Sequence, residues 1–172
     1  MANICWFEMR MRGTKADCIA MGHSGIPCYD VRIVGEKGTE EDYMVYLLGE
    51  CRWSVTSSMV DVDEEETLAA KAKKFNLELE VCGLDESEEC SEHFHYKGAE
   101  VIKENNLPPY IEAWEIEEGE VEFTEEELQK YTLQDDVYVL KEEFVEHFSF
   151  DYDLNEARFD FTMSFNDLLG DN

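Results

Sequence analysis

The stretch YMVYLLGECRWSV, residues 43–55, decides how the N-terminal part of this chain folds. It opens with an unbroken apolar run from Tyr43 to Leu48, which is typical of a strand buried on both faces inside a sheet. Gly49 follows the run and predicts a β-bulge, because a glycine inside a strand often marks one. We therefore expect a central strand here, with other strands of the same sheet on either side.

The residues before this stretch predict a strand, a helix and a second strand. Apolar and polar residues alternate over residues 3–12, which is the two-residue period of a strand. Thr14 is a suitable N-cap for a short helix that continues to about Met21. The strand expected at residues 29–34 is followed by a turn at residues 35–38, which begin and end with glycine.

The residues after the stretch predict a second helix and more strands. EEETLAAKAKKF, residues 64–75, has an acidic first turn and a lysine-rich last turn, as the helix dipole favours. A strand is expected at residues 77–83, and then a hairpin whose tip is Lys97-Gly98. The resulting order, β-α-β-β-α-β-β, predicts an α+β fold in which helices cover one face of a mainly antiparallel sheet.

Residues 105–109, NNLPP, are the best candidate for a boundary in the chain. We expect a folded module at residues 1–104 and an acidic α+β extension at residues 105–172 that packs on it. Thr124 and Glu127 have the spacing of a capping box at a helix start. The patterns of the extension predict two short strands around Gly119, a helix at 124–131, a strand at 137–140, a helix at 141–148 and a strand at 157–165.

The chain carries a formal net charge of −28, most of it in the C-terminal part. Residues 104–172 contain 21 acidic and three basic residues, together with twelve aromatic ones. A disordered acidic tail would be poor in aromatic residues, so we expect the charge to lie on the surface of a folded structure. Such a surface repels nucleic acid and anionic membranes, and it attracts basic protein surfaces and cations.

Neither a membrane span nor an exported protein is expected. No run is long and apolar enough to cross a bilayer, and the first ten residues do not have the layout of a signal peptide. We therefore expect a cytoplasmic protein whose six cysteines are reduced, several of them in the core. The arginines Arg10, Arg12, Arg32 and Arg52 are expected to form internal or surface ion pairs rather than to face a partner.

Residues 1–103 resemble the YubB ferredoxin-like domain family, small proteins carried by plasmids and phages. The likeness rests on four segments: MANICWFEMRMRGTK at the start, Cys51-Arg52-Trp53-Ser54 at the end of a strand, LAAKAKKFNLELEV, and SEHFHYKGAEV in the hairpin. It says little about residue 108 onward. The resemblance implies a ferredoxin-like α/β sandwich and a mobile-element context, but no iron–sulfur cluster and no catalytic residues.

Two short patterns come near to catalytic or metal-binding motifs. His93 and His95 point to one face of a strand, and Cys90 is close in sequence, but a structural zinc site needs a fourth ligand. Residues 22–25, GHSG, lack the glycine spacing of a nucleophile elbow. We therefore expect no enzyme activity, no cofactor and no dedicated metal site.

Residues 151–155, DYDLN, match the first ligand positions of a calcium-binding loop. That loop requires glycine at its sixth position and glutamate at its twelfth, where this chain has Glu156 and Thr162. The stretch is therefore not an EF-hand, although loose calcium binding by clustered carboxylates stays open.

The candidate partner-binding site is a set of acidic residues between positions 112 and 136. Solubility needs a net charge of magnitude about 2–8 in a small domain, and this chain exceeds it several-fold. Carboxylates lie about 6.6–6.8 Å apart when they alternate along a strand and about 5–6 Å apart at helical spacing, so rows of them can approximate the charge density of DNA. The candidates are Glu112, Glu115, Glu117, Glu118, Glu120, Glu122, Glu125, Glu126, Glu127, Asp135 and Asp136.

The acidic surface predicts an inhibitor that imitates nucleic acid and binds the basic channel of a host defence nuclease, and the resemblance implies that a phage or plasmid encodes it. A Cas9-type CRISPR effector is the first choice of target, which makes the chain a candidate anti-CRISPR protein, because the guide and target channels are strongly basic. A restriction enzyme is the second choice. Two alternatives stay open: a protein-interaction module that acts away from any nucleic-acid site, and a binder that responds to calcium or another metal.

Overall fold

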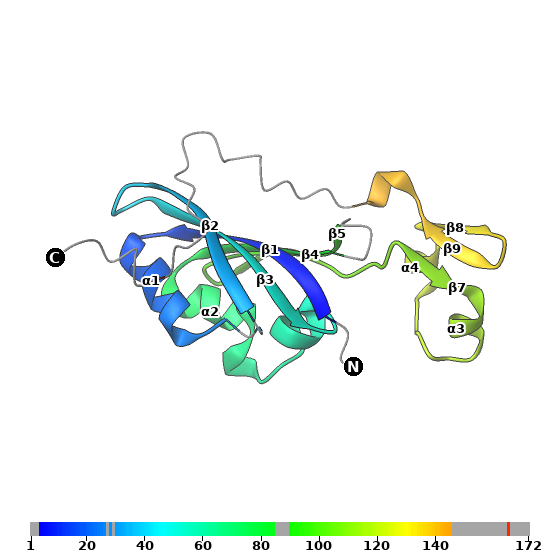
Figure 1. Ribbon diagram of the computed structural model, residues 1–172. Helices are drawn as coiled ribbons and strands as arrows, with labels where there is room; N and C mark the ends of the chain where they lie inside the picture. The colour runs from blue at the N-terminus through cyan, green and yellow to red at the C-terminus, as the bar shows by residue number, and fades with distance from the viewer. Residues whose placement is uncertain (1–3, 27, 29, 85–89, 146–164, 166–172) are drawn as a thin grey trace.

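The computed structural model describes residues 4–26, 28, 30–84, 90–145 and 165. Two helices, α1 (Lys15–Ser24) and α2 (Leu68–Phe75), lie on one face of a six-stranded sheet (Figure 1). The strands of this sheet are β1 (Ile4–Gly13), β2 (Asp30–Gly38), β3 (Tyr43–Arg52), β4 (Glu78–Leu84), β5 (Cys90–Lys97) and β6 (Glu100–Asn105). Their order across the sheet is β2-β3-β1-β4-β5-β6, and each neighbouring pair is antiparallel. The predicted α+β class and mainly antiparallel sheet are therefore confirmed.

Strand β3 lies between β2 and β1, so the prediction of an interior strand is confirmed. The strand ends at Arg52, however, and not at Val55 as predicted. All its residues from Tyr43 to Leu47 are buried, as the apolar run indicates. Neighbouring β1 alternates instead, and its Phe7, Met9 and Met11 are buried in the main core together with residues of both helices. The core thus lies between the sheet and the helix layer.

Gly49 does not form the predicted bulge. It stays in register opposite Phe7 of β1, and a Cβ atom at position 49 would lie 2.3 Å from the Phe7 ring. The glycine therefore serves close packing across the strand pair, not an irregular backbone. The register shift in this part of the sheet lies between Ile33 and Gly35 of β2.

The turn after β2 comes later than the sequence indicates, because β2 continues through Gly38. The Thr39 N–H donates a hydrogen bond of 2.9 Å to the carbonyl oxygen of Asp42, which closes the turn. Gly38 has a φ of +110°, and a Cβ atom there would lie 2.1 Å from the same oxygen. Only a glycine fits this turn, and it is the last glycine of the pair rather than the first that marks it.

The helix predicted at residues 64–75 is divided in two. Glu64–Glu66 form a 3₁₀ turn, and α2 begins only after Thr67. The Thr67 hydroxyl accepts a hydrogen bond of 3.1 Å from the Ala70 N–H, so this threonine is the N-cap. A π-helical turn at Thr56–Val60, which the sequence did not indicate, follows β3.

Two local predictions in this part of the chain are confirmed. Thr14 caps α1, because its hydroxyl accepts a hydrogen bond of 3.1 Å from the Asp17 N–H. Gly98 has a φ of +56° and lies in the tight connection between β5 and β6, as expected for a hairpin tip.

A second sheet of three strands lies at the opposite end of the molecule from α1 (Figure 1). Its strand order is β7-β9-β8, and Ile111, Tyr131 and Leu140 form a small hydrophobic cluster of their own. We call residues 110–140 the small-sheet segment. Its elements are β7 (Tyr110–Glu112), α3 (Ala113–Glu117), α4 (Glu125–Leu128), β8 (Tyr131–Gln134) and β9 (Val137–Leu140).

The two short strands predicted around Gly119 are wrong. The chain enters α3 directly after β7, and Gly119 follows this helix with a φ of +72°. Glu112 and Glu115 form a capping box, in which the Glu115 side chain accepts a hydrogen bond of 2.9 Å from the Glu112 N–H. The capping box starts a helix in a stretch whose alternation alone favours a strand.

The end of the small-sheet segment agrees with the sequence only in part. Thr124 and Glu127 form the predicted capping box of α4. The helix ends at Leu128, however, and Tyr131 begins β8 instead of ending the helix. The strand predicted at residues 137–140 is confirmed as β9.

Beyond β9 little of the prediction falls on described residues. The described part of the helix expected at residues 141–148 contains a 3₁₀ turn at Glu142–Phe144. The stretch 151–155 lies outside the described residues, as does the strand expected at 157–165 apart from Phe165. The Phe165 ring packs against α1, where a Cβ atom on Gly22 would lie 2.3 Å from it.

Candidate functional site

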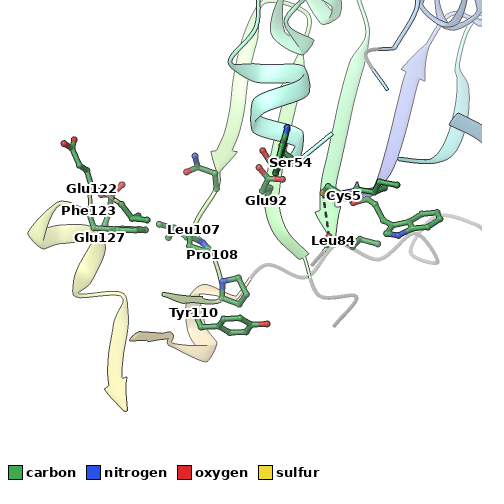
Figure 2. Close-up of a pocket in the computed structure, with 16 residues that line it drawn as sticks. Cys5, Ser54, Leu84, Glu92, Leu107, Pro108, Tyr110, Glu122, Phe123 and Glu127 are labelled. Carbon is green, nitrogen blue, oxygen red and sulfur yellow. Dashed lines mark hydrogen bonds between the residues drawn. The ribbon is translucent and has the colours of Figure 1, made fainter. Parts of the chain in front are cut away.

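A cavity of about 1100 Å³ lies between the six-stranded sheet and the small-sheet segment. Figure 2 shows Cys5, Ser54, Leu84 and Glu92 on one side, and Glu122, Phe123 and Glu127 on the other, with Leu107, Pro108 and Tyr110 between them. Cavities at the junction of two folded parts are common binding sites. The lining residues are Ile4, Cys5, Trp6, Trp53, Ser54, Leu84, Glu92, Asn106, Leu107, Pro108, Pro109, Tyr110, Val121, Glu122, Phe123 and Glu127.

Glu92 of β5 is a buried carboxylate that holds one wall of this cavity. It accepts hydrogen bonds from the Val55 N–H over 2.8 Å, from the Thr56 N–H over 3.0 Å and from the Thr56 hydroxyl. A Cβ atom on Gly83 of β4 would lie 2.5 Å from the same carboxylate, so a larger residue there would displace the Glu92 side chain. The hydrogen bonds of Glu92 therefore fix the start of the turn Thr56–Val60 against the sheet.

Trp53 lies in the cavity wall with an unusual backbone conformation. Its φ is +67°, a left-handed value that is rare for a bulky residue and that tends to occur at functional sites. The ring is 53% exposed, and the Arg52 guanidinium lies 5.6 Å from its centre. Trp6 and Tyr110, which also line the cavity, are each 56% exposed. Exposed aromatic side chains grouped in this way are typical of surfaces that contact a partner.

Most of the predicted acidic site residues lie exposed on the small-sheet segment, which contains eleven acidic residues and one lysine. Among the described residues, no exposed acidic residue of this predicted set forms an ion pair. Glu115 and Glu127 are half-buried instead, because each accepts backbone hydrogen bonds in a capping box. The exposed residues are Glu112, Glu117, Glu118, Glu120, Glu122, Glu125, Glu126, Asp135 and Asp136.

The structure brings only some of these acidic residues together. Asp135 and Asp136 form the tight turn between β8 and β9, with φ values of +48° and +65°. The Ala113 N–H donates a hydrogen bond of 2.8 Å to the carbonyl oxygen of Asp136, which places this turn beside Glu112. Glu122 and Glu127 line the cavity. The site is therefore a set of carboxylates on several elements rather than one continuous row.

The Glu127 carboxylate shows how firmly one of these groups is held. It accepts hydrogen bonds from the Thr124 N–H over 2.8 Å and from the Thr124 hydroxyl over 3.0 Å. These bonds hold the pKa of Glu127 below its usual value. The Glu127 carboxylate therefore caps the start of α4 and is less available to bind a partner.

The histidines of the candidate metal site bind carboxylates of the neighbouring strand. The Nε2 atom of His93 lies 2.8 Å from Glu80 and that of His95 lies 2.8 Å from Glu78. Burial raises the pKa of Glu80, but the hydrogen bond from His93 and the charge of Arg10 outweigh this effect and lower it. Among the described residues, no group of three or more His, Cys, Asp or Glu side chains is placed to hold a metal ion.

Three of the four arginines named above form the expected ion pairs. Arg10 pairs with Glu80, Arg12 with Asp42 and Arg32 with Asp30. Among the cysteines, the thiols of Cys5, Cys18, Cys28 and Cys51 are free, as expected. Cys82 contradicts the expectation of reduced cysteines throughout, because its sulfur is in a disulfide bond.

Sequence reasoning missed the cavity and the residues that shape it. Glu92 and Thr56 are 36 positions apart, and no local pattern predicts that the Glu92 carboxylate accepts a hydrogen bond from the Thr56 N–H. The sequence shows Trp53 beside Arg52 in the segment 51–54, but the exposure of the tryptophan is seen only in the structure. Its left-handed backbone conformation has no sequence signature.

Comparisons with known proteins add no identity to this site. No protein-family model, no curated protein and no solved structure matches the chain. No helix in the described part of the chain is long and apolar enough to cross a membrane. The resemblance to the YubB ferredoxin-like family and the assignment of a partner therefore stay predictions.

Proposed function

We propose that this chain is a non-enzymatic inhibitor from a phage or plasmid that places its carboxylates where a host nuclease binds phosphates. The observation that carries the proposal is the exposed acidic set of the small-sheet segment, whose nine members have no ion-pair partner among the described residues. Carboxylates without internal partners remain available to a basic surface. The formal net charge of −28 to which they contribute is several-fold larger in magnitude than the about 2–8 that solubility requires.

A folded scaffold supports this function better than a flexible tail would. The small-sheet segment has its own hydrophobic cluster, and a capping box starts each of its two helices. Its carboxylates are therefore held in place before binding, and the entropy lost on association is smaller. The carboxylates lie on the two helices and on the β8–β9 turn. They therefore face several directions, as the phosphates around a duplex do.

The choice of target follows the chemistry of the acidic surface. A Cas9-type CRISPR effector is favoured, because it encloses guide and target in a positively charged channel. A restriction enzyme is the second choice. The mobile-element context and a ferredoxin-like module at residues 1–104 are parts of the same proposal. The ferredoxin-like module is supported by the order β-α-β-β-α-β through β4 and by the neighbouring strands β2-β3-β1-β4.

The test is a DNA-cleavage assay with a purified Cas9-type effector and its guide RNA. We expect added protein to inhibit cleavage, and excess guide RNA or target DNA to relieve the inhibition. Replacement of Glu117, Glu118, Glu120 and Glu122 by lysine should weaken binding at least about tenfold, a loss of about 1.4 kcal/mol. Inhibition that saturating nucleic acid leaves unchanged contradicts mimicry.

A matched control comes from the six-stranded part of the chain. Asp61, Asp63, Glu64 and Glu65 are exposed, and their replacement by lysine changes the net charge by the same amount. This variant should retain most of its potency if the small-sheet segment makes the contact. Equal losses in both variants would show that net charge alone acts.

The cavity favours a second candidate function, a protein-interaction module that acts away from nucleic-acid sites. Trp6, Trp53 and Tyr110 supply the exposed aromatic groups that often carry most of the binding energy at interfaces. Substitution of Trp6 and Trp53 by alanine separates the two functions. Lost binding in this variant, together with retained binding in the lysine variant, assigns the contact to the cavity.

A further inference from the structure

We propose that Cys5 and Cys51 form a redox-active dithiol, which closes to a cross-strand disulfide when a low-molecular-weight disulfide such as oxidised glutathione enters the cavity. The two residues lie directly opposite each other in the β1–β3 pair. Both thiols are free, and both side chains are buried on the core face of the sheet. This inference does not depend on the proposed inhibitor function.

The register alone places the two cysteines within bonding range. Opposite residues of an antiparallel pair have Cα atoms about 4.5 or 5.5 Å apart, depending on the hydrogen-bonding of the pair. A disulfide accepts Cα separations of about 4.4–6.8 Å. Because both values fit, Cys5 and Cys51 can be joined without moving either strand. The Cys5 thiol donates to the carbonyl oxygens of Trp6 and Leu84 over 3.4 and 3.8 Å, and the Cys51 side chain has the largest influence on the pKa of Cys5.

Cys5 is the thiol that an external disulfide can reach. It lines the cavity and is 8% exposed, whereas Cys51 is fully buried and does not line the cavity. The hydrogen bond from Cys51 lowers the pKa of the Cys5 thiol, against the opposing effects of burial and of Glu92. The same hydrogen bond, together with burial, raises the pKa of Cys51. Cys5 is therefore the attacking sulfur, and Cys51 is the resolving one.

The reaction balances without any other reagent. The Cys5 thiolate attacks one sulfur of oxidised glutathione, so that a mixed disulfide forms and one glutathione thiolate leaves. The Cys51 thiol then loses its proton to that thiolate and attacks the Cys5 sulfur, which releases the second glutathione. In total the protein loses two electrons and two protons, and one glutathione disulfide becomes two thiols.

Two other free cysteines serve as internal controls. Burial raises the pKa of Cys18 to about 12 and that of Cys28 to about 11, so both are poor nucleophiles at neutral pH. Neither lies opposite another cysteine in the described strand pairs. We therefore expect the modification to be confined to Cys5 and Cys51.

The test uses the full-length protein, incubated with oxidised glutathione, alkylated to block remaining thiols and digested for peptide mass mapping. We expect a peptide pair joined through Cys5 and Cys51, which dithiothreitol separates. The Cys51→Ser variant should stop at a glutathione adduct on Cys5, and Cys18→Ser should still give the joined pair. Far-UV circular dichroism of each variant confirms that it is folded.

Two outcomes overturn the proposal. One is a folded wild-type protein in which Cys5 and Cys51 both remain open to alkylation after oxidation. The other is a stable glutathione adduct on wild-type Cys5 that Cys51 does not resolve. Either result would show that the two thiols, although opposite each other, cannot be joined in the folded state.

Discussion

Gly49 of β3 lies directly opposite Phe7 of β1, and the Phe7 ring occupies the space that a side chain at position 49 would need. A Cβ atom there would lie 2.3 Å from the ring and 2.8 Å from the carbonyl oxygen of Asp30. Gly49→Ala should therefore lower the free energy of unfolding by about 1–3 kcal/mol, as overpacking of a core does. Urea unfolding followed by circular dichroism measures this loss.

The double variant Gly49→Ala/Phe7→Leu tests whether the ring is the cause. A smaller side chain at position 7 relieves the overlap. The double variant should therefore lose less unfolding free energy than the sum of the losses in the two single variants. Strict additivity would show that the backbone contact with Asp30, not the Phe7 ring, requires the glycine.

Loss of the Glu92 carboxylate should destabilise the protein through the groups that it leaves unpaired. Glu92→Ala removes the acceptor for the Val55 N–H and the Thr56 N–H, and we expect a cost of about 2–4 kcal/mol in unfolding free energy. Chemical denaturation measures it. Glu100→Ala, at an exposed position of β6, is the matched control and should change stability by less than about 0.5 kcal/mol.

Trp53 should tolerate glycine better than alanine. Its φ of +67° costs an L-residue about 1 kcal/mol, and glycine adopts this value freely. Trp53→Gly should therefore be about 1 kcal/mol more stable than Trp53→Ala in thermal or urea unfolding. The opposite order, which is normal inside a strand, would mean that the left-handed conformation is not kept in solution.

The Glu80 carboxylate should contribute to the loss of stability in acid. Its folded-state pKa lies below the ordinary value of 4.5, so its stabilising effect is complete above that pH and is lost as the pH falls through the lowered value. Unfolding free energies measured between pH 6 and pH 3 should fall less steeply for Glu80→Gln than for the wild type. Parallel curves would assign the acid sensitivity to other carboxylates.

Salt should stabilise this protein, because the exposed carboxylates of the small-sheet segment repel one another. Raising NaCl from about 10 mM to 500 mM shortens the screening length severalfold, and we expect about 1 kcal/mol of stabilisation, or about 2–4 °C in Tm for a chain of this size. Replacement of Glu117, Glu118, Glu120 and Glu122 by glutamine should reduce this shift. The same number of neutral substitutions at Asp61, Asp63, Glu64 and Glu65 provides the comparison in differential scanning fluorimetry.

The features that could be predicted from the sequence depend on neighbouring residues. The apolar run that begins at Tyr43 predicts an interior strand, because such a run has no polar face that could be exposed to solvent. Thr14 and Thr124 cap helices, since a hydroxyl reaches an N–H three positions along the chain. The concentration of acidic residues at positions 112–136 is a property of composition alone.

Some errors arose where two local rules disagree. The stretch after Tyr110 alternates acidic and apolar residues as a strand does, yet Glu112 and Glu115 form a capping box and α3 follows. Gly49 has the sequence appearance of a bulge, but its role depends on the ring of Phe7, which lies 42 positions away. The first conflict lies within a few residues, whereas the second is resolved only by the pairing of β1 with β3.

The sequence by itself therefore determined the class of the fold, the order of the strands and of α1 and α2 as far as β5, and the amount of charge. Only the tertiary structure decided which distant groups meet. The pairing of β1 with β3 sets Cys5 opposite Cys51, and the pairing of β4 with β5 brings Glu92 to Thr56 beside the cavity. The physical reason is that a strand register is fixed by the packing of a whole sheet, while caps and runs are fixed within a few residues.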